Sequence, residues 1–217
     1  MTRNRWIDDL QWIRPGQQTR SQRTQHAILD AAEALFARQG VDGTSVAAIA
    51  EEAKCSVGAV YHHFKDKEAL LYALYKRMTD RFQSVSADAL DPARWEGASI
   101  EDILRGYLEF SLRISRENPG FKQAALEAAQ RNPALQQHYA EIQRDLYQGL
   151  RKLILARSDG IRHTDPDLAV RFVLDQFAAM IQLRKDKSAV YAQMHRRSDA
   201  HFIDQAIQSA KSYLKID

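Results

Sequence analysis

The sequence is short of cysteine and lacks long apolar runs, and each shortage excludes a class of protein. Cys55 is the single cysteine among 217 residues, so no disulfide can form within one chain. No run of about 18 consecutive apolar residues occurs, which excludes an ordinary membrane-spanning helix. Residues 1–16 carry charges of both signs and lack the apolar segment of a secretory signal. We therefore expect a cytoplasmic protein with no membrane partner.

Glycine and proline are also scarce, and the residues that replace them favour helices. Only 9 glycines and 5 prolines occur, whereas alanine, leucine, glutamine and arginine, all good helix formers, recur throughout. No block alternates valine, isoleucine and threonine as a strand would. The net charge of +3 permits DNA binding without requiring it. We predict an all-α fold with about nine helices.

Residues 1–20 are predicted to form an N-terminal extension that contains Trp6 and Trp12. Trp6, Leu10 and Ile13 fall near one face of a short helix that Pro15 would end. Such a segment either packs on the body of the protein or on a partner chain, or forms a loosely ordered tail. The sequence leaves these alternatives open.

Four helices are predicted in the next part of the chain from apolar spacing and capping residues. The first spans about 22–39 and ends at Gly40, where a helix C-cap glycine belongs. Thr44 or Ser45 caps a second helix that ends at residue 52, and Ser56 caps a third that ends near residue 63. Residues 53–55 form the turn between them, and a fourth helix spans about 67–87.

Longer helices are predicted after residue 92. Ser99 can cap a helix that stops before residue 118, and Asp165 can cap another whose first residue is Pro166. The other predicted helices span about 121–131, 133–157 and 199–213. No internal repeat or low-complexity tract occurs.

The segment 44–67 is the one that suggests DNA as a partner. Val57, Gly58 and Ala59 are small, so the backbone of the third helix can approach base edges closely. Val57 or Ala59 can lie against a thymine methyl group, which is read by apolar contact. By their spacing, Val60 and Phe64 point back into a core.

Groups that can bind phosphates surround this helix. Tyr61 offers a hydroxyl, and His62 and His63 offer ring N–H groups. Lys67 and the free N–H groups at the start of the fourth helix are expected to form an anion site, and Ser45 to act similarly at the second helix. This arrangement is typical of a helix-turn-helix that binds double-stranded DNA.

The run from residue 23 to residue 72 resembles the N-terminal DNA-binding region of the TetR (tetracycline-repressor-type) family. The matching blocks keep both their content and their spacing. They are Ile28-Leu29-Asp30-Ala31-Ala32-Glu33, Leu35-Phe36, Gly40, Thr44-Ser45-Val46, Ile49-Ala50, Ser56 to Phe64, and Lys67-Glu68.

Two positions depart from the family pattern. Lys54 stands where glycine is common, so it must accept an unusual backbone conformation or the turn differs. Ala47 stands where some relatives place a base-reading arginine, which would leave base readout to the third helix and to DNA shape.

The resemblance implies a homodimeric transcriptional regulator, usually a repressor, released from its operator by a small-molecule effector. After the extension at 1–20, it implies a DNA-binding domain at 21–81 with its motif at about 44–64, and a helical ligand-binding and dimerisation domain at 82–217. The candidate DNA-binding residues are Thr44, Ser45, Ser56, Val57, Gly58, Ala59, Tyr61, His62, His63, Lys65 and Lys67.

Two further sets of residues are candidates in the C-terminal domain. Six residues can line a ligand cavity, although aromatic residues at helical spacing are more often plain core: Trp95, Tyr107, Phe110, His138, Tyr139 and Phe177. The helices opened by Asp165 and Asp199 carry broad apolar faces that one subunit is not expected to cover, which predicts a four-helix dimer interface. Its residues would be Val170, Val173, Leu174, Phe177, Ile181, Phe202, Ile203, Ala206, Ile207 and Ala210.

No catalytic residue, metal or cofactor is expected. His62 and His63 are adjacent, so on a helix they diverge and cannot hold one metal ion together. The sequence contains no glycine-rich phosphate loop and no nucleophile elbow. Cys55 is interpreted as a small buried residue. The alternatives to a DNA-binding regulator are a helical enzyme and a helical protein-interaction module.

Overall fold

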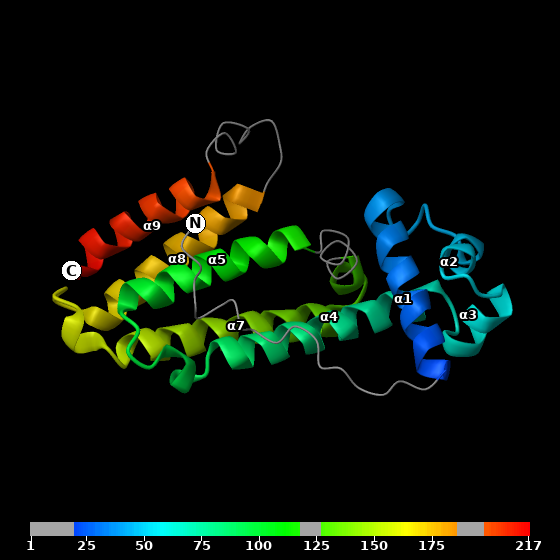
Figure 1. Ribbon diagram of the computed structural model, residues 1–217, viewed down its shortest axis with the longest axis horizontal. Coiled ribbons are helices and arrows are strands. Elements are labelled where there is room, and N and C mark those ends of the chain that lie inside the picture. The colour runs from blue at the N-terminus through cyan, green and yellow to red at the C-terminus, as the bar shows by residue number, and fades with distance from the viewer. Residues whose placement is uncertain (1–19, 118–126, 186–197) are drawn as a thin grey trace. The chain divides into compact units, whose positions relative to one another are not determined.

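The computed structural model describes residues 20–117, 127–185 and 198–217, and within those ranges every regular element is helical (Figure 1). The elements are α1 (Arg20–Gln39), α2 (Val46–Glu52), α3 (Val57–His63), α4 (Lys67–Ala89), the 3-10 helix η1 (Pro92–Trp95), α5 (Ile100–Glu117), α7 (Pro133–Leu155), the 3-10 helix η2 (Ser158–Gly160), α8 (Pro166–Lys185) and α9 (Asp199–Leu214). Residues 127–131 are also helical. The all-α prediction is confirmed. The predictions for residues 1–19 and 121–126 fall outside the described ranges.

Most helices begin at the capping residues that the sequence indicated. Of Thr44 and Ser45, the structure selects Ser45, whose Oγ accepts a hydrogen bond from the Ala48 N–H at 3.1 Å. Ser99 Oγ accepts from the Asp102 N–H at 3.1 Å while the Asp102 carboxylate accepts from the Ser99 N–H at 2.9 Å. This reciprocal pair satisfies two backbone donors that the first turn of α5 would otherwise leave unpaired.

The chain divides into two compact units whose borders differ from the predicted domain borders. Of the described residues, the N-terminal unit contains 20–85 and 127–142, and the C-terminal unit contains 86–117, 143–185 and 198–217. Residues 127–142 were expected in the C-terminal domain. They join the N-terminal unit because Ala128 is fully buried in its apolar core, with Leu135 and Tyr139 packed against the same cluster.

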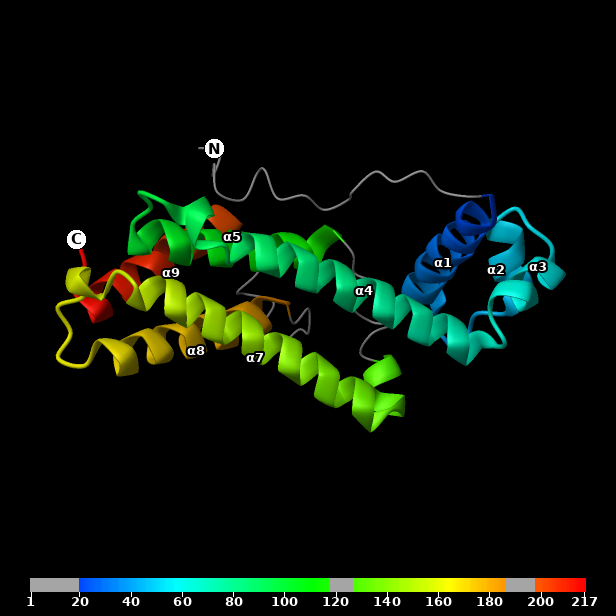
Figure 2. The same ribbon diagram turned by 90° about the horizontal axis from the view of Figure 1, so that it is seen from below.

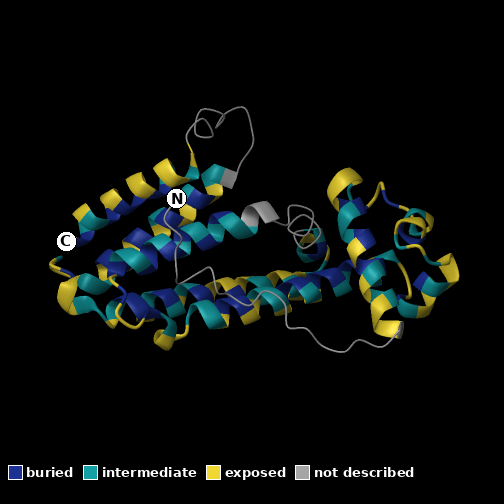
Figure 3. Cartoon of the chain, viewed as in Figure 1, coloured by how far each residue is buried: buried dark blue, intermediate teal, exposed yellow. Residues whose placement is uncertain are grey.

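The core of the N-terminal unit draws on all four of its first helices. Its most deeply buried side chains come from the inner faces of these helices, as the dark segments of Figure 3 show: Ile28, Ala32, Phe36, Ile49, Val60, Leu70, Leu71 and Leu74. Gly40 ends α1 with a φ of 75°, and its N–H donates to the Phe36 carbonyl at 2.9 Å. This is the left-handed C-cap for which glycine carries no steric penalty.

In the C-terminal unit, α5 packs against α8 and α9, and α8 packs against α9. An ion pair at 2.6 Å between Arg151 of α7 and Asp167 in the first turn of α8 joins these two helices, which are labelled in Figure 2. The α5–α9 contact is edged by Lys211–Glu101 and Arg105–Asp204 ion pairs, each at 2.7 Å. None of the helices in the described ranges has the length and hydropathy needed to cross a bilayer.

The 3-10 helix η1 was not predicted, and it anchors a tryptophan. No element was predicted for residues 92–95, but Asp91 Oδ1 accepts from the Ala93 N–H at 3.0 Å and starts a short turn. The Trp95 indole N–H then donates to the Ala89 carbonyl at 2.7 Å. Its ring lies against Gly106 of α5, where an added Cβ would be 2.6 Å from the ring. Gly106 is therefore required by close packing.

Candidate nucleic-acid interface

The outer face of α3 exposes apolar side chains. Val57 and Tyr61, one helical turn apart, are 42% and 54% exposed. The opposite side of this segment is packed into the core through the buried side chains of Val60 and Phe64. At Gly58, the nearest atom to an added Cβ is Ser56 Oγ at 3.8 Å. This face is therefore both thin and open, and the predicted inward position of Val60 and Phe64 is confirmed.

Two serines cap α2 and α3 and keep a donor for another partner. Ser45 Oγ accepts from the Ala48 N–H, and Ser56 Oγ accepts from the Ala59 N–H, both at 3.1 Å. A hydroxyl that accepts such a bond still has its own O–H. Both residues are exposed, so each can donate to a phosphate oxygen, as their positions in the sequence led us to expect.

Thr44 differs from the expectation that it contacts DNA. Its side chain is only 2% exposed, and its hydroxyl donates to the Gly40 carbonyl at 2.7 Å and accepts from the Gln39 side-chain amide at 3.3 Å. The role of Thr44 as a surface contact was therefore predicted wrongly. The residue instead fixes the loop between α1 and α2, and this loop positions Ser45.

Lys67 also has a structural role that the sequence did not show. Its ammonium group donates to the Val41 carbonyl at 2.8 Å and to the Thr44 carbonyl at 3.2 Å, which leaves one of its three N–H donors. In addition, the Asp66 carboxylate accepts from the Ala69 N–H at 2.7 Å. The expected anion site at the start of α4 therefore already holds a carboxylate, and Asp66 is a capping residue that its type and position before the helix would have indicated.

The turn between α2 and α3 has the hydrogen bonds of a Schellman motif. The Lys54 N–H donates to the Glu51 carbonyl at 3.0 Å, and the Cys55 N–H donates to the Ala50 carbonyl at 2.9 Å. Lys54 has a φ of 54°, a left-handed conformation that costs a residue with a Cβ about 1–2 kcal/mol. Of the two alternatives for this position, the turn keeps its geometry and Lys54 accepts the conformation. Cys55 was expected to be buried, and it packs against the core while remaining only partly buried.

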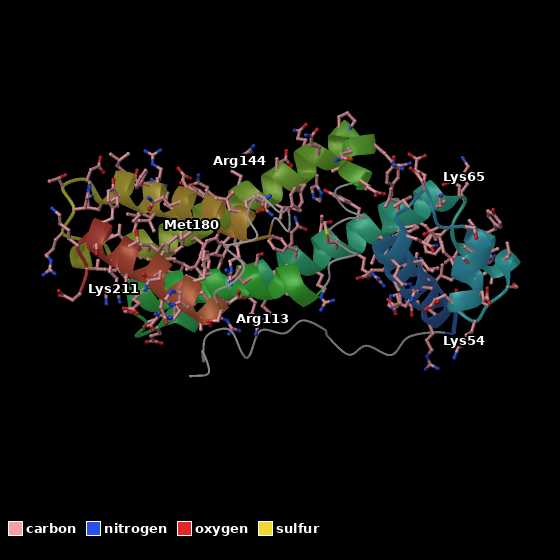
Figure 4. The ribbon with its side chains drawn as sticks, turned by 90° about the horizontal axis from the view of Figure 1, so that it is seen from above. Lys54, Lys65, Arg113, Arg144, Met180 and Lys211 are labelled. Atoms are coloured by element: carbon pink, nitrogen blue, oxygen red, sulfur yellow. The ribbon has the colours of Figure 1, made fainter. Side chains whose placement is uncertain are left out.

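The residues that follow α3 present polar groups. His62 is exposed and His63 is half-buried, and their rings meet edge to face with centroids 5.2 Å apart. Lys65 is exposed, and Figure 4 places it and Lys54 at opposite edges of the N-terminal unit. The unit thus presents a thin apolar helix with hydroxyl, imidazole and ammonium groups around it.

The six candidate ligand-binding residues are not brought together in one unit. Trp95, Tyr107, Phe110 and Phe177 belong to the C-terminal unit, whereas His138 and Tyr139 belong to the N-terminal unit. Trp95, Phe110 and Phe177 are buried core residues. Burial raises the pKa of the Tyr107 hydroxyl, which has a side-chain hydrogen bond with Ser111.

The residues predicted to form a dimer interface are mostly buried within a single chain. Of the ten, nine are buried and only Phe202 is partly exposed, with the Arg184 guanidinium 5.0 Å from its ring centre. The expectation that one subunit leaves these faces uncovered is therefore wrong, because α5, α8 and α9 cover one another. The large apolar side chains that α8 exposes are Leu168 and Phe172, at 53% and 44%.

Known proteins match this chain most clearly in the N-terminal unit. Residues 28–74 match the family model for bacterial regulatory proteins of the tetR family. An HTH-type transcriptional repressor of Mycobacterium tuberculosis is 40% identical over 60 residues, which cover 28% of this chain and 32% of that protein. The TetC protein of transposon Tn10 from Escherichia coli is 32% identical over 97 residues, which cover 43% of this chain and 47% of that protein. The chain thus aligns with less than half the length of these relatives.

The fold agrees over most of the chain. The crystal structure of the TetR family transcriptional regulator PfmR from Thermus thermophilus covers 87% of this chain and 97% of its own, with a TM-score of 0.58 and 24% identity. At that identity the likeness shows the fold alone, whereas the sequence match lies on the segment that contains α2 and α3. Residues 28–74 thus match the tetR family model, in a chain whose all-helical fold is like that of solved TetR-family regulators.

Proposed function

We propose that this protein is a homodimeric transcriptional regulator, a repressor in its simplest form, that binds a palindromic operator through α3 and leaves it when a small effector binds. The observation that carries the proposal is the distribution of exposed large apolar side chains. In the described ranges there are four, Val57 and Tyr61 on α3 and Leu168 and Phe172 on α8. Each pair lies on one helix face, and exposed apolar residues that cluster in this way mark binding surfaces. We assign the α3 pair to DNA and the α8 pair to a protein interface.

The α3 pair supports reading of the major groove. Val57 can contact a thymine methyl group, and the lack of a side chain at Gly58 lets the helix backbone approach the bases. The hydroxyls of Ser45, Ser56 and Tyr61 can donate to phosphates on either side, which sets the register of the helix on the duplex. A repressor name among the relatives supports repression as the outcome. Operator DNA as the partner places the protein in the cytoplasm.

The α8 pair supports dimerisation. Leu168 and Phe172 are one turn apart and face away from the core that Val170, Val173 and Leu174 join. A two-fold dimer through this face would present two copies of α3 to successive major grooves, and a palindromic operator matches that symmetry.

Effector release would be a shift between two conformations of the dimer, of which only one has the correct spacing of the two α3 helices. The proposal draws on residues 127–142, which follow α5 in the chain and yet pack into the core of the N-terminal unit. A ligand that changes the position of this segment would therefore act directly on the unit that carries α3.

The proposal is tested by selecting DNA from a random-sequence duplex pool with the parent protein. We expect enrichment of inverted repeats whose half-sites are centred about 10 base pairs, or a multiple, apart. The selected duplex should bind the parent tightly and bind Tyr61→Ala weakly, while Tyr107→Phe, in the C-terminal unit, should bind as the parent does. If the parent enriches no sequence above the starting pool, the proposed function is wrong.

A further inference from the structure

Lys54 has three properties that together require an explanation. It is the single lysine or arginine between Thr44 and Phe64, the segment that contains α2, the turn and α3. It occupies a left-handed conformation, with a φ of 54°, which lysine rarely adopts. Its side chain is exposed, and within the described ranges no hydrogen bond or ion pair to its ammonium group occurs. Intramolecular contacts therefore do not account for a lysine at this strained position.

The turn determines where this ammonium group is presented. The hydrogen bonds from Lys54 and Cys55 to the carbonyls of α2 fix the backbone whatever side chain stands at residue 54. Lys54 comes shortly before the start of α3, and Lys65 comes shortly after its end. Figure 4 shows the two lysines at opposite edges of the N-terminal unit. The outer face of α3 is thus bracketed along the chain by two exposed cations.

The charged residues near Lys54 show that it supplies the only lysine or arginine charge of α2, the turn and α3. Glu51 is exposed, and Glu52 is paired with Arg38 at 3.1 Å. Removal of Lys54 would leave α2, the turn and α3 with two carboxylates and no lysine or arginine. Such a surface would approach a row of phosphates with an unfavourable electrostatic energy.

A helix in the major groove lies between two rows of phosphates, because the groove is about 12 Å wide. We propose that Lys54 binds a DNA phosphate at one edge of the groove that α3 enters, while Lys65 faces the opposite strand. The inference rests on the proposed DNA-binding function and adds a phosphate-binding residue to it. Because phosphate contacts carry no sequence information, Lys54 supports binding to every duplex and not to one operator alone.

The test uses a fluorescently labelled duplex of random sequence, and binding of the full chain is followed by anisotropy over a series of salt concentrations. Three variants separate charge from backbone conformation. Lys54→Gln removes the charge and keeps the strained backbone, Lys54→Arg keeps both, and Lys54→Gly removes the charge and relieves the strain. Lys76→Gln is the matched control, because Lys76 is an exposed lysine of the same unit that lies in the body of α4.

We expect Lys54→Gln to weaken binding several-fold and to reduce the slope of log affinity against log salt by about 0.9, which is the contribution of one neutralised phosphate. Lys54→Arg should keep the parental slope. Lys54→Gly should show the same reduced slope and yet melt at a higher temperature than the parent, which would show that weaker binding does not come from unfolding. Lys76→Gln should keep the parental slope.

Two results would overturn the inference and leave the proposed function standing. One is a parental slope in Lys54→Gln, and the other is an equal reduction of the slope in Lys76→Gln, which would indicate a general effect of net charge. If instead the parent itself shows no salt-dependent binding to the duplex, the proposed function fails, and the role of Lys54 fails with it. Binding by the parent therefore distinguishes the two cases.

Discussion

The Arg131 guanidinium donates to the Asp42 carboxylate at 2.9 Å and ties residues 127–131 to the loop that follows α1. Both side chains are well exposed, and the hydrogen bond from Arg131 holds the pKa of the Asp42 carboxyl below its usual value. Next to this pair, Ala128 is buried in the core of the same unit. The N-terminal unit thus contains a segment far from the helix-turn-helix in sequence, fixed by one buried contact and one surface ion pair.

We expect Arg131→Gln to increase hydrogen exchange at residues 127–132 and to leave exchange at α3 unchanged. The effect should depend on pH. Because the pKa of Asp42 is lowered in the folded protein, the stabilisation from the pair is complete above the unfolded value of about 3.9 and is lost as the pH falls through the folded value. The difference between parent and variant should therefore shrink in acid. Arg38→Gln, which removes the exposed pair with Glu52, is the control and should change exchange at α2 instead.

A second contact, made by the Tyr75 hydroxyl of α4, connects the first four helices to the start of α7. It donates to the Leu135 carbonyl at 2.8 Å and lies 3.2 Å from His138 Nδ1. Burial raises the pKa of this hydroxyl, so it stays protonated and donating at neutral pH. We expect Tyr75→Phe to lower the free energy of unfolding by about 1 kcal/mol, because a part-buried carbonyl loses its donor. Urea unfolding measures the change.

Tyr72→Phe is the matched control for this prediction. The Tyr72 hydroxyl donates to Glu68 at 2.5 Å one turn away on the exposed side of α4, where water can replace it. Its removal should cost clearly less than the removal of the Tyr75 hydroxyl. Equal losses in the two variants would show that the bond to Leu135 does not hold residues 133–142 in place.

We expect substitution by alanine to have opposite effects on the melting temperature at two helical glycines, Gly58 and Gly106. Alanine is favoured over glycine in a helix by about 1 kcal/mol, and Gly58 of α3 has room for a Cβ, whose nearest neighbour would be Ser56 Oγ at 3.8 Å. Gly58→Ala should therefore raise the melting temperature, and it should weaken DNA binding because the new methyl group enters the space between α3 and the bases. Gly106→Ala should lower the melting temperature, because its Cβ would be 2.6 Å from the Trp95 ring. Thermal melts and DNA titrations of both variants test the pair, and unchanged DNA binding in Gly58→Ala would contradict the proposed docking of α3.

Local signals in the sequence were sufficient to predict the helices and the outer face of α3. A capping serine acts within three residues, as Ser45 and Ser56 do, and apolar spacing reports which side of a helix is buried. These features depend on neighbours in the chain, so the sequence displays them. The two alternatives for the conformation of Lys54 came instead from the family resemblance, in which glycine is common at this position.

Thr44 and Asp66 were misjudged although their hydrogen bonds are local, but the other errors concern contacts between residues far apart in the chain. Apolar spacing identified the inner faces of α8 and α9, but it does not say what covers them, and α5 of the same chain does so. Ala128 has no property that would assign it to a core formed by residues much earlier in the sequence. The ammonium of Lys67 binds carbonyls 23 and 26 residues away, which no local pattern reveals.

In the proposed dimer, Phe172 lies at the subunit interface and Val57 lies at the DNA surface, so the same substitution can be compared at the two sites. Both are exposed apolar residues on a helix surface, and replacement by glutamate adds the same charge to each. Phe172→Glu should shift the protein to monomers in sedimentation velocity, because a carboxylate at a two-fold interface faces its own copy and must lose its water. DNA binding should then weaken as well, since one α3 helix engages only one half-site. Val57→Glu should remain a dimer and lose DNA binding directly through repulsion from phosphates. If Phe172→Glu and Leu168→Glu both sediment as the parent does, the dimer uses another surface, and the assignment of the exposed α8 face is wrong.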